Sequence, residues 1–261
     1  MTLFLVGGGP SAALNDVHDA YAASVGFRAR GHAPRVAYLS VGRREDVGHF
    51  ASGYTAPLLE RLPQCEVVEV YLDAPVAAEQ TESSEQGGTS EQSESSEQAL
   101  PDLSEMDGII IAGGHTPSYV SALAAHRSQL SRLVSGDVPV IGYSAGAMAA
   151  SRHAFVGGFR HQGRQVGNEE ASEGLAEVSI VDGLALVSPT VVCHNDAWGL
   201  DGLAITIVEQ NWSRTVVALD EDACLIVDPI SGRTALYGTG RIRWFTRDAG
   251  GISVKTQYPD D

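Results

Sequence analysis

The 261-residue sequence has few cysteines and no long apolar run. Its three cysteines, Cys65, Cys193 and Cys224, include no pair with metal-ligand spacing, and an odd number does not suit a disulfide framework. We therefore expect free thiols in a reducing compartment, which predicts a cytoplasmic protein. No stretch has the length of a membrane span, and residues 1–9 lack the basic start of a signal peptide.

Positive charge is also scarce. The chain has 33 acidic and 17 basic residues, a net charge of −16, and Lys255 is its single lysine. An acidic surface repels the phosphates of nucleic acids and of anionic lipids. We therefore expect neither a nucleic acid nor a membrane as a partner. The sequence leaves the oligomeric state open, a homodimer included.

The first half of the chain alternates short aliphatic runs with segments of helical periodicity. This alternation predicts an α/β fold with a mostly parallel sheet flanked by helices. After the fifth strand, shorter apolar runs separated by glycine-bearing turns predict an additional β-rich C-terminal part. We expect a single domain over 1–261. The predicted strands are 3–6, 35–41, 66–72, 108–112, 138–141, 178–181, 190–194, 215–219, 223–227 and 241–245. The predicted helices are 11–24, 44–61, 116–133 and 202–209.

A repeat of Glu, Ser and Gln at 79–98 interrupts this pattern. It offers no apolar side chains to a core, so burial cannot offset the entropy lost on ordering it. We interpret it as a disordered low-complexity insertion, because the α/β pattern continues on both sides. A docking role is the alternative.

The chemistry is concentrated at the turn after the fifth predicted strand, where Gly142, Ser144 and Gly146 form a Gly-x-Ser-x-Gly pattern. This pattern is typical of a nucleophile elbow, a tight strand-to-helix turn that exposes a serine hydroxyl. The turn also places Ser144 at a helix N-terminus, where free N–H groups favour negative charge. The alternative is that the serine only caps the helix.

A catalytic serine needs a base, an acid that orients the base, and two donors for the oxyanion. The backbone N–H groups of Gly114 and Ala145 can be the donors, because the carboxyl ends of parallel strands share one edge of the sheet. A plain strand-to-helix turn at Gly114 is the alternative. His115 lies at the same edge, where it can contact substrate.

Of the eight histidines, His194 is the best candidate for the base, because it ends an apolar strand and opens a polar run. His18 and His126 are expected at the surface of helices. His153 is expected on the elbow helix, pointing away from the serine. The orienting acid can come from the carboxylates at 220–222, for which a solvated turn is the alternative.

Several of these motifs occur in an order that resembles the cyanophycinase and peptidase E family of serine peptidases. The segment around residue 221 matches, and the Asn-Asp-Met-Pro stretch of peptidase E is missing, so the resemblance is closer to the cyanophycinase-like branch. The motifs that carry it are Gly113-Gly114, the elbow at 142–147, Gly157-Gly158, Asp182-Gly183-Leu184, His194 and Asp220-Glu221-Asp222-Ala223.

The resemblance implies a class I glutamine amidotransferase-like, flavodoxin-like fold. It implies Ser144 as nucleophile, His194 as base and Glu221 as orienting acid. It also implies oxyanion donors at Gly114 and Ala145, with no metal and no cofactor. The expected reaction is hydrolysis of a peptide or isopeptide bond in a small aspartyl-containing peptide, through an acyl-enzyme.

The sequence departs from the cyanophycinase pattern in two places. His115 stands where cyanophycinase-like sequences usually have a glutamine. Asn195 and Asp196 begin the stretch after the histidine, which is rich in arginine in cyanophycinase-like sequences and has none over 195–200 here. We take these three residues as candidate substrate-binding residues. Without the arginines, which suit a substrate carboxylate, cyanophycin itself is not the expected substrate.

Three other functions stay open at this point. An esterase could use the same elbow with an acid such as Asp182, before the histidine in the chain. A non-catalytic small-ligand binding protein would fit the altered His115 and the missing arginines. Dinucleotide binding at 7–9 is the weakest of the three, because that turn lacks Gly-x-Gly-x-x-Gly spacing.

Overall fold

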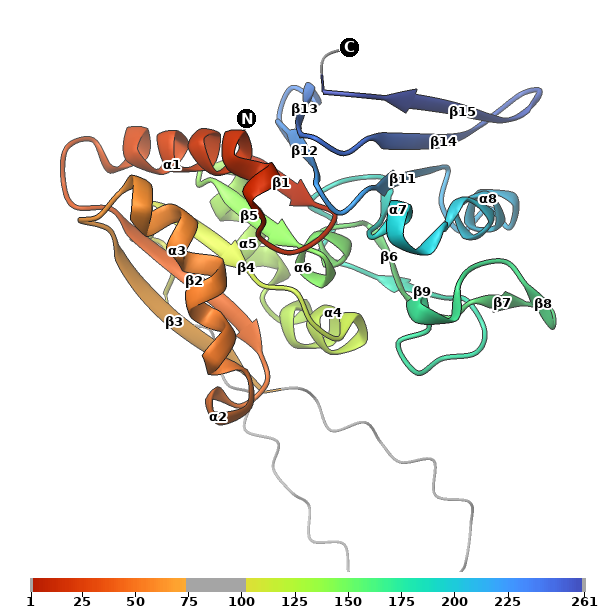
Figure 1. The fold of residues 1–261 in the computed structure, drawn as a ribbon, viewed down its shortest axis with the longest axis horizontal. Coiled ribbons are helices and arrows are strands. Elements are labelled where there is room, and N and C mark those ends of the chain that lie inside the picture. Colours follow the sequence, from red (N-terminus) through yellow and green to blue (C-terminus); the bar gives the residue numbers. More distant parts are fainter. Residues whose placement is uncertain (1, 74–101, 260–261) are drawn as a thin grey trace, which may run out of the picture.

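The computed structural model describes residues 2–73 and 102–259, so the predicted insertion at 79–98 lies outside the described residues. A seven-stranded sheet in the order β13-β12-β1-β5-β4-β2-β3 forms its centre (Figure 1). The strands of this sheet are β1 (Leu3–Val6), β2 (Arg35–Val41), β3 (Glu66–Leu72), β4 (Gly108–Ile111), β5 (Val140–Tyr143), β12 (Ala223–Val227) and β13 (Thr234–Gly238).

The strands β1, β5, β4, β2 and β3 run parallel, and β12 and β13 extend the sheet with antiparallel pairs. Every residue of β1, β4 and β5 is buried, which explains why these strands are apolar without alternation. The predicted α/β class with a mostly parallel sheet is therefore confirmed.

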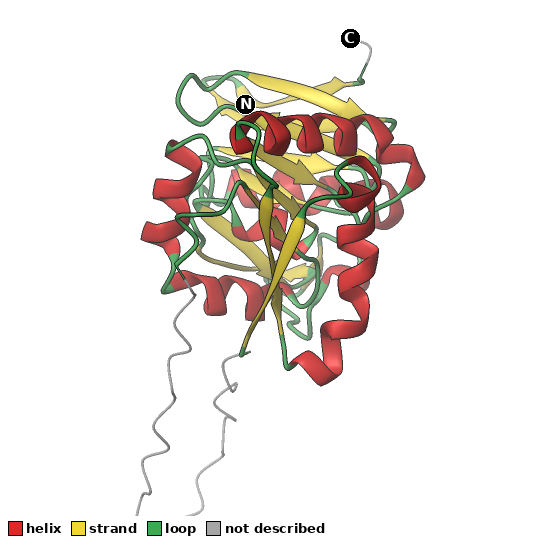
Figure 2. Cartoon of the chain, turned by 90° about the vertical axis from the view of Figure 1, so that its left-hand side faces the viewer, coloured by secondary structure: helices red, strands yellow, loops and turns green. Residues whose placement is uncertain are grey.

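Helices cover both faces of the sheet (Figure 2). Helix α1 packs beside α3, and α4 packs beside α6. The prediction of one continuous helix over 44–61 is wrong, because the structure has three helical segments there. Gly48, a poor helix former, ends the first of them. The predicted helix 116–133 is also divided. The helical segments here are η1 (Ala12–Leu14), α1 (Asn15–Ala29), α2 (Arg44–Val47), η2 (Gly48–Phe50), α3 (Ala51–Arg61), α4 (Thr116–Ala124), α5 (Arg127–Ser135) and α6 (Ala145–Ala149).

The C-terminal part contains a four-stranded sheet in the order β10-β11-β14-β15 and two small strand pairs, as the predicted β-rich texture required. His153 begins strand β6 and does not lie on the elbow helix, because α6 already ends at Ala149. The elements are β6 (His153–Gly157), β7 (Arg160–His161), β8 (Arg164–Gln165), η3 (Glu169–Ala171), β9 (Ser179–Asp182), β10 (Thr190–Val192), α7 (Asn195–Trp198), α8 (Asp201–Glu209), β11 (Thr215–Leu219), β14 (Ile242–Asp248) and β15 (Gly251–Gln257).

Two further expectations concern single side chains. Cys65, Cys193 and Cys224 are free thiols, as predicted, and all three are buried. His18 is 4% exposed, so the expectation of a surface histidine is wrong: it lies on the buried side of α1. Within residues 2–73 and 102–259, no helix combines the length and the apolar character needed to cross a bilayer.

Candidate active site

Ser144 lies in a strained turn between β5 and α6. Its backbone has φ 47° and ψ −109°, a conformation that non-glycine residues rarely adopt and that is typical of a nucleophile elbow. The Ser144 N–H donates to the carbonyl of Val6 at 3.0 Å, and the Ser144 carbonyl accepts from the N–H of Met148 at 2.9 Å. The side chain makes no capping hydrogen bond to the helix, which removes the support for a capping serine.

The two glycines of the elbow allow α6 to pack closely against the sheet. A Cβ atom at Gly142 would lie 2.8 Å from the carbonyl carbon of Gly146. A Cβ atom at Gly146 would lie 2.8 Å from the carbonyl oxygen of Ile111 at the end of β4. Both contacts are too short for a side chain, so the pattern Gly-x-Ser-x-Gly is a packing requirement of this turn.

The hydroxyl of Ser144 belongs to a continuous chain of hydrogen bonds. Ser144 Oγ lies 2.8 Å from His194 Nε2, and His194 Nδ1 lies 2.8 Å from Glu221 Oε1. A carboxylate only accepts hydrogen bonds, so the neutral imidazole donates from Nδ1–H to Glu221 and accepts at Nε2 from the serine hydroxyl. The His194 side chain is 16% exposed and that of Glu221 is 48% exposed. The structure thus brings together three residues from distant parts of the sequence.

The turn after β1 supports both the histidine and the glutamate. The His194 N–H donates to the carbonyl of Gly7 at 3.1 Å, and the Gly7 N–H donates to the carbonyl of Ala223 at 3.0 Å. A Cβ atom at Gly7 would lie 2.1 Å from the carbonyl oxygen of Asp220, and one at Gly8 would lie 2.9 Å from the Cβ of Glu221. Two of the three glycines considered for dinucleotide binding, Gly7 and Gly8, are therefore needed for close packing of the segments that carry the base and the acid.

The two expected oxyanion donors lie in the turns that follow the neighbouring strands β4 and β5. Ala145 is the first residue of α6, so its N–H has no acceptor within the helix. The Gly113 N–H donates to Tyr54 Oη at 3.1 Å, whereas the Gly114 N–H has no hydrogen-bond partner among the described residues. A Cβ atom at Gly113 would lie 3.3 Å from the Ser144 Cβ, which places this turn directly against the serine.

The three expected substrate-binding residues occupy different environments. The His115 side chain is 54% exposed, and its ring nitrogens lie 2.8 Å from Ser118 Oγ and 3.2 Å from the carbonyl oxygen of Glu173. Asn195 is 2% exposed and accepts a hydrogen bond from the N–H of Leu200, so it is turned into the interior and does not support the expected contact with substrate. Asp196 is exposed and contacts Glu221.

Glu173 is a residue of this region that the sequence did not single out. Its Oε1 accepts hydrogen bonds from the N–H and the hydroxyl of Thr116, at 3.3 and 2.7 Å, and so stabilises the start of α4. Thr116 is the first residue of this helix, and His115 is its N-cap. A Cβ atom at Gly157 would lie 2.4 Å from the Ser172 carbonyl oxygen, so the absence of a side chain at Gly157 allows the loop that carries Glu173 to pack against β6. In the sequence, the Gly157-Gly158 pair was the signal that could have pointed to this loop.

Cys193, which precedes His194, is not a competing nucleophile. It is fully buried beneath the site, and its Sγ donates to the carbonyls of Ser144 and Val6 at 3.5 and 3.8 Å. Burial raises the pKa of the Cys193 thiol well above its ordinary value, which keeps the thiol protonated. Within the described ranges, no group of three or more His, Cys, Asp or Glu side chains is arranged to hold a metal ion.

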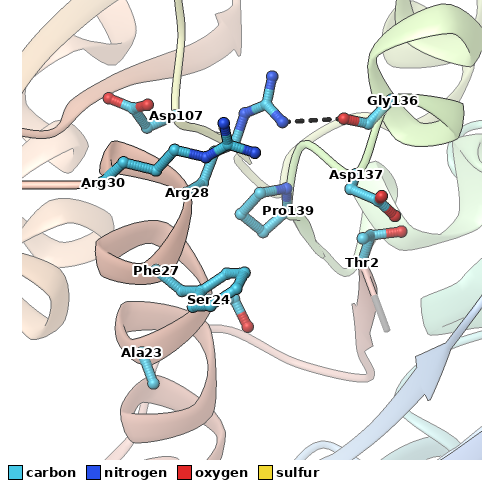
Figure 3. Close-up of a pocket in the computed structure, with 10 residues that line it drawn as sticks. All are labelled: Thr2, Ala23, Ser24, Phe27, Arg28, Arg30, Asp107, Gly136, Asp137 and Pro139. Atoms are coloured by element: carbon cyan, nitrogen blue, oxygen red, sulfur yellow. Dashed lines mark hydrogen bonds between the residues drawn. The ribbon is translucent and has the colours of Figure 1, made fainter.

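A cavity of about 780 Å³ lies at the opposite edge of the sheet (Figure 3). Its walls include Thr2, Asp107 and Pro139, which immediately precede the parallel strands β1, β4 and β5, respectively. Arg28 crosses it and donates to the carbonyl of Gly136 at 2.8 Å. Because Ser144 follows the carboxyl end of β5, this cavity is separate from the candidate site.

A serine that follows the carboxyl end of a parallel strand and is hydrogen-bonded to a histidine, which in turn is bonded to a glutamate, has the arrangement of a serine hydrolase. The chain belongs to peptidase family S51, whose family profile matches residues 89–232. The resemblance seen in the sequence is therefore confirmed at the level of the family.

The chain is also similar to a solved structure described as the crystal structure of a peptidase from an acI-B1 Actinobacterium. The TM-score is 0.55 at 13% sequence identity, and the match covers 98% of this chain and 96% of that chain. At this identity the likeness supports the fold. No curated protein matches the chain.

Proposed function

We propose that this member of family S51 is a serine peptidase that cleaves a peptide or isopeptide bond of a small aspartyl-containing peptide through an acyl-enzyme. The observation that carries the proposal is the chain of two 2.8 Å contacts from Ser144 through His194 to Glu221. Membership of a peptidase family supports it independently.

In the proposed mechanism, Ser144 Oγ attacks the carbonyl carbon of the scissile bond while His194 Nε2 takes the hydroxyl proton. Glu221 accepts the hydrogen bond from Nδ1–H and stabilises the imidazolium that forms. The tetrahedral intermediate then collapses as His194 gives the proton to the leaving amine, which breaks the C–N bond and leaves an ester on Ser144. Water, activated by the same imidazole, hydrolyses this ester and restores the serine hydroxyl.

The backbone N–H groups of Gly114 and Ala145 are the proposed donors to the oxyanion. Two observations support them: neither N–H is used within a helix or a strand, and the two residues follow the paired strands β4 and β5, of which β5 leads into Ser144. Donors held in place by the backbone stabilise the developing charge without reorganising. Every step of the proposed reaction is performed by side chains and N–H groups of the chain itself.

For the substrate, we propose a small peptide of the kind cleaved by the cyanophycinase-like branch. Cyanophycin itself is not the proposed substrate. The segment Asp220–Ala223 supports that branch. The absence of arginines from residues 195–200, where they would suit a substrate carboxylate, counts against cyanophycin itself. His115, half-exposed beside the proposed oxyanion donor Gly114, and the exposed Asp196 are the remaining candidates for a contact with the substrate.

The test compares Ser144→Ala with the wild-type protein on a panel of α- and β-aspartyl dipeptides. We expect kcat/KM to fall by about a thousandfold or more, because the covalent step loses its nucleophile. Ser253→Ala, which removes an exposed hydroxyl on β15, is the matched control and should retain full activity. Unchanged turnover by Ser144→Ala contradicts the mechanism.

A serine-directed phosphonate separates this proposal from the other functions. The structure places Asp182 3.6 Å from His153 and not beside His194, so the esterase arrangement with Asp182 as the acid has no support. Labelling of Ser144 by the phosphonate is expected for the peptidase. Peptide binding without any labelling would instead indicate a non-catalytic binding protein.

A further inference from the structure

Helix α7, a single turn from Asn195 to Trp198, directly follows His194 and lies beside β11 (Figure 1). It begins with the hydrogen bond from the Trp198 N–H to the His194 carbonyl, at 2.9 Å. We propose that Asp196 and Trp198, both on this turn, are positioning residues that hold the acid and the base of the site. The inference deepens the proposed function and rests on it for its kinetic consequences.

The first contact fixes the acid. Asp196 Oδ1 accepts a hydrogen bond from the backbone N–H of Glu221 at 2.9 Å. Glu221 is half-exposed, so packing of its own side chain does little to restrain it. The bond from Asp196 restrains the backbone from which the Glu221 carboxylate reaches the imidazole. A carboxylate that accepts from a backbone N–H makes a charge-assisted bond, which is stronger than a neutral one.

The neighbouring carboxylates of the same turn have other partners. Asp220 Oδ2 accepts from the N–H of Arg241 at 3.2 Å and pairs with its guanidinium at 3.1 Å. Asp222 Oδ1 accepts from the hydroxyl of Ser11 at 2.6 Å. Hydrogen bonds to other segments therefore restrain Asp220 and Asp222 at the ends of the turn, and the bond from Asp196 restrains Glu221 at its centre. Of the three consecutive carboxylates, Glu221 is the one directed at the histidine.

The second contact restrains the base. The ring of Trp198 lies against the ring of His194, with centroids 4.4 Å apart and planes inclined by 30°. This contact limits rotation of the imidazole about its own axis, which would otherwise misalign Nε2 with the serine hydroxyl. An indole face also attracts a cation, so it favours the imidazolium that forms as Ser144 loses its proton.

Asp196 has a competing role, as a charge that binds the substrate. Asp196→Asn distinguishes the two, because the amide oxygen keeps the acceptor for the Glu221 N–H and removes the negative charge. For a positioning residue, Asp196→Ala should lower kcat about tenfold to a hundredfold at unchanged KM, and Asp196→Asn should restore most of it. A rise in KM in both variants overturns the positioning role. Asp248→Ala removes a similar turn acceptor on β14 and should change neither constant.

For Trp198, leucine and phenylalanine substitutions separate stacking from apolar volume. Trp198→Leu should lower kcat about tenfold, and Trp198→Phe should recover most of that loss because an aromatic face remains. Trp212→Leu is the matched control, because Trp212 contacts a different histidine, His161, edge-on with ring centroids 5.2 Å apart. The Trp212→Leu substitution should have no effect on kcat. Equal kcat in the leucine and phenylalanine variants overturns the stacking role. Thermal melting of each variant checks that it is folded.

Crystal structures of Asp196→Ala and Trp198→Leu test the positioning without any turnover. We expect Asp196→Ala to lengthen the contact between His194 Nδ1 and Glu221 Oε1 beyond about 3.5 Å, the limit for a hydrogen bond. We expect Trp198→Leu to lengthen the contact between Ser144 Oγ and His194 Nε2 in the same way. Retention of both 2.8 Å contacts overturns the proposal. Failure of the proposed function gives a different result: the wild type cleaves no peptide and takes no phosphonate label, whatever these crystals show.

Discussion

At the scale of single residues, Ser144 combines a reactive position with an unfavourable backbone. Its φ of 47° and ψ of −109° hold the hydroxyl above the end of β5 and toward His194. Such a conformation costs a non-glycine residue on the order of 1–3 kcal/mol. The surrounding contacts of the turn, including the bond to Val6, compensate for this cost.

The strain at this residue can be measured with two variants that both lack the hydroxyl. Ser144→Gly should be more stable than Ser144→Ala by about 1 kcal/mol, because glycine tolerates positive φ and this gain exceeds its larger entropy loss on folding. Urea unfolding of the two variants gives the difference. Equal stability, or a more stable alanine variant, would show that the turn is not strained.

At the scale of elements, the turn after β1 joins the histidine-bearing and glutamate-bearing segments. Gly7 exchanges backbone hydrogen bonds with His194 and Ala223, and Gly8 lies against Glu221. The sequence contains this glycine run, but its partners lie roughly two hundred positions later in the chain. Local reasoning about the run therefore led to a nucleotide-binding alternative and not to its packing role.

Adjacent glycines of this turn provide a matched pair of alanine variants. A Cβ atom at Gly8 would lie 2.9 Å from the Glu221 Cβ and carbonyl oxygen, whereas one at Gly9 would have no atom within 4 Å. Gly8→Ala should displace the glutamate and lower kcat about tenfold or more, while Gly9→Ala should leave it unchanged. Steady-state kinetics of both variants test this. The same activity in both would mean that the Gly8 contact does not position the acid.

At the scale of the whole molecule, the sequence predicted more of the parallel half than of the β-rich half. Buried parallel strands are recognisable because they are apolar over most of their length without alternation, as in β4. His153, the first residue of β6, was expected on the elbow helix because the alanines of 145–150 have high helix propensity, although α6 ends at Ala149. Strands β13 and β15 are half-exposed and carry a weaker apolar signal, so the sequence did not predict them.

For the site, motif order was enough to choose Ser144, His194 and Glu221, which lie in contact in the structure. Their catalytic roles stay predictions. The burial of Asn195 and the contacts of Asp196 and Trp198 depend on how α7 packs, and no local pattern in the sequence carries that information.

One buried histidine contributes to the dependence of the stability of the whole molecule on pH. Burial, with a smaller contribution from the charge of Arg61, lowers the pKa of His18 from its ordinary 6.5 to about 4. Its Nε2 has no hydrogen-bond partner within the described residues. Between these two values the unfolded chain binds a proton that the folded chain does not bind. The free energy of unfolding should therefore fall by about 2 kcal/mol as the pH decreases from 7 to 5.

Chemical denaturation at several pH values measures this dependence. In His18→Leu, which has no imidazole to protonate, the decrease between pH 7 and 5 should be smaller by the same amount. An identical pH dependence in the two proteins would contradict the assignment to His18.

The link between β11 and β12 crosses from the four-stranded sheet to the seven-stranded sheet, and Glu221 lies within that link. Ser144 follows a strand of the larger sheet, and His194 follows a strand of the smaller one. A slight slip of one sheet against the other would thus separate the serine from its base while each sheet stayed intact. Enzymatic activity should therefore disappear at a lower urea concentration than secondary structure, which makes turnover a sensitive reporter of how the two sheets are docked.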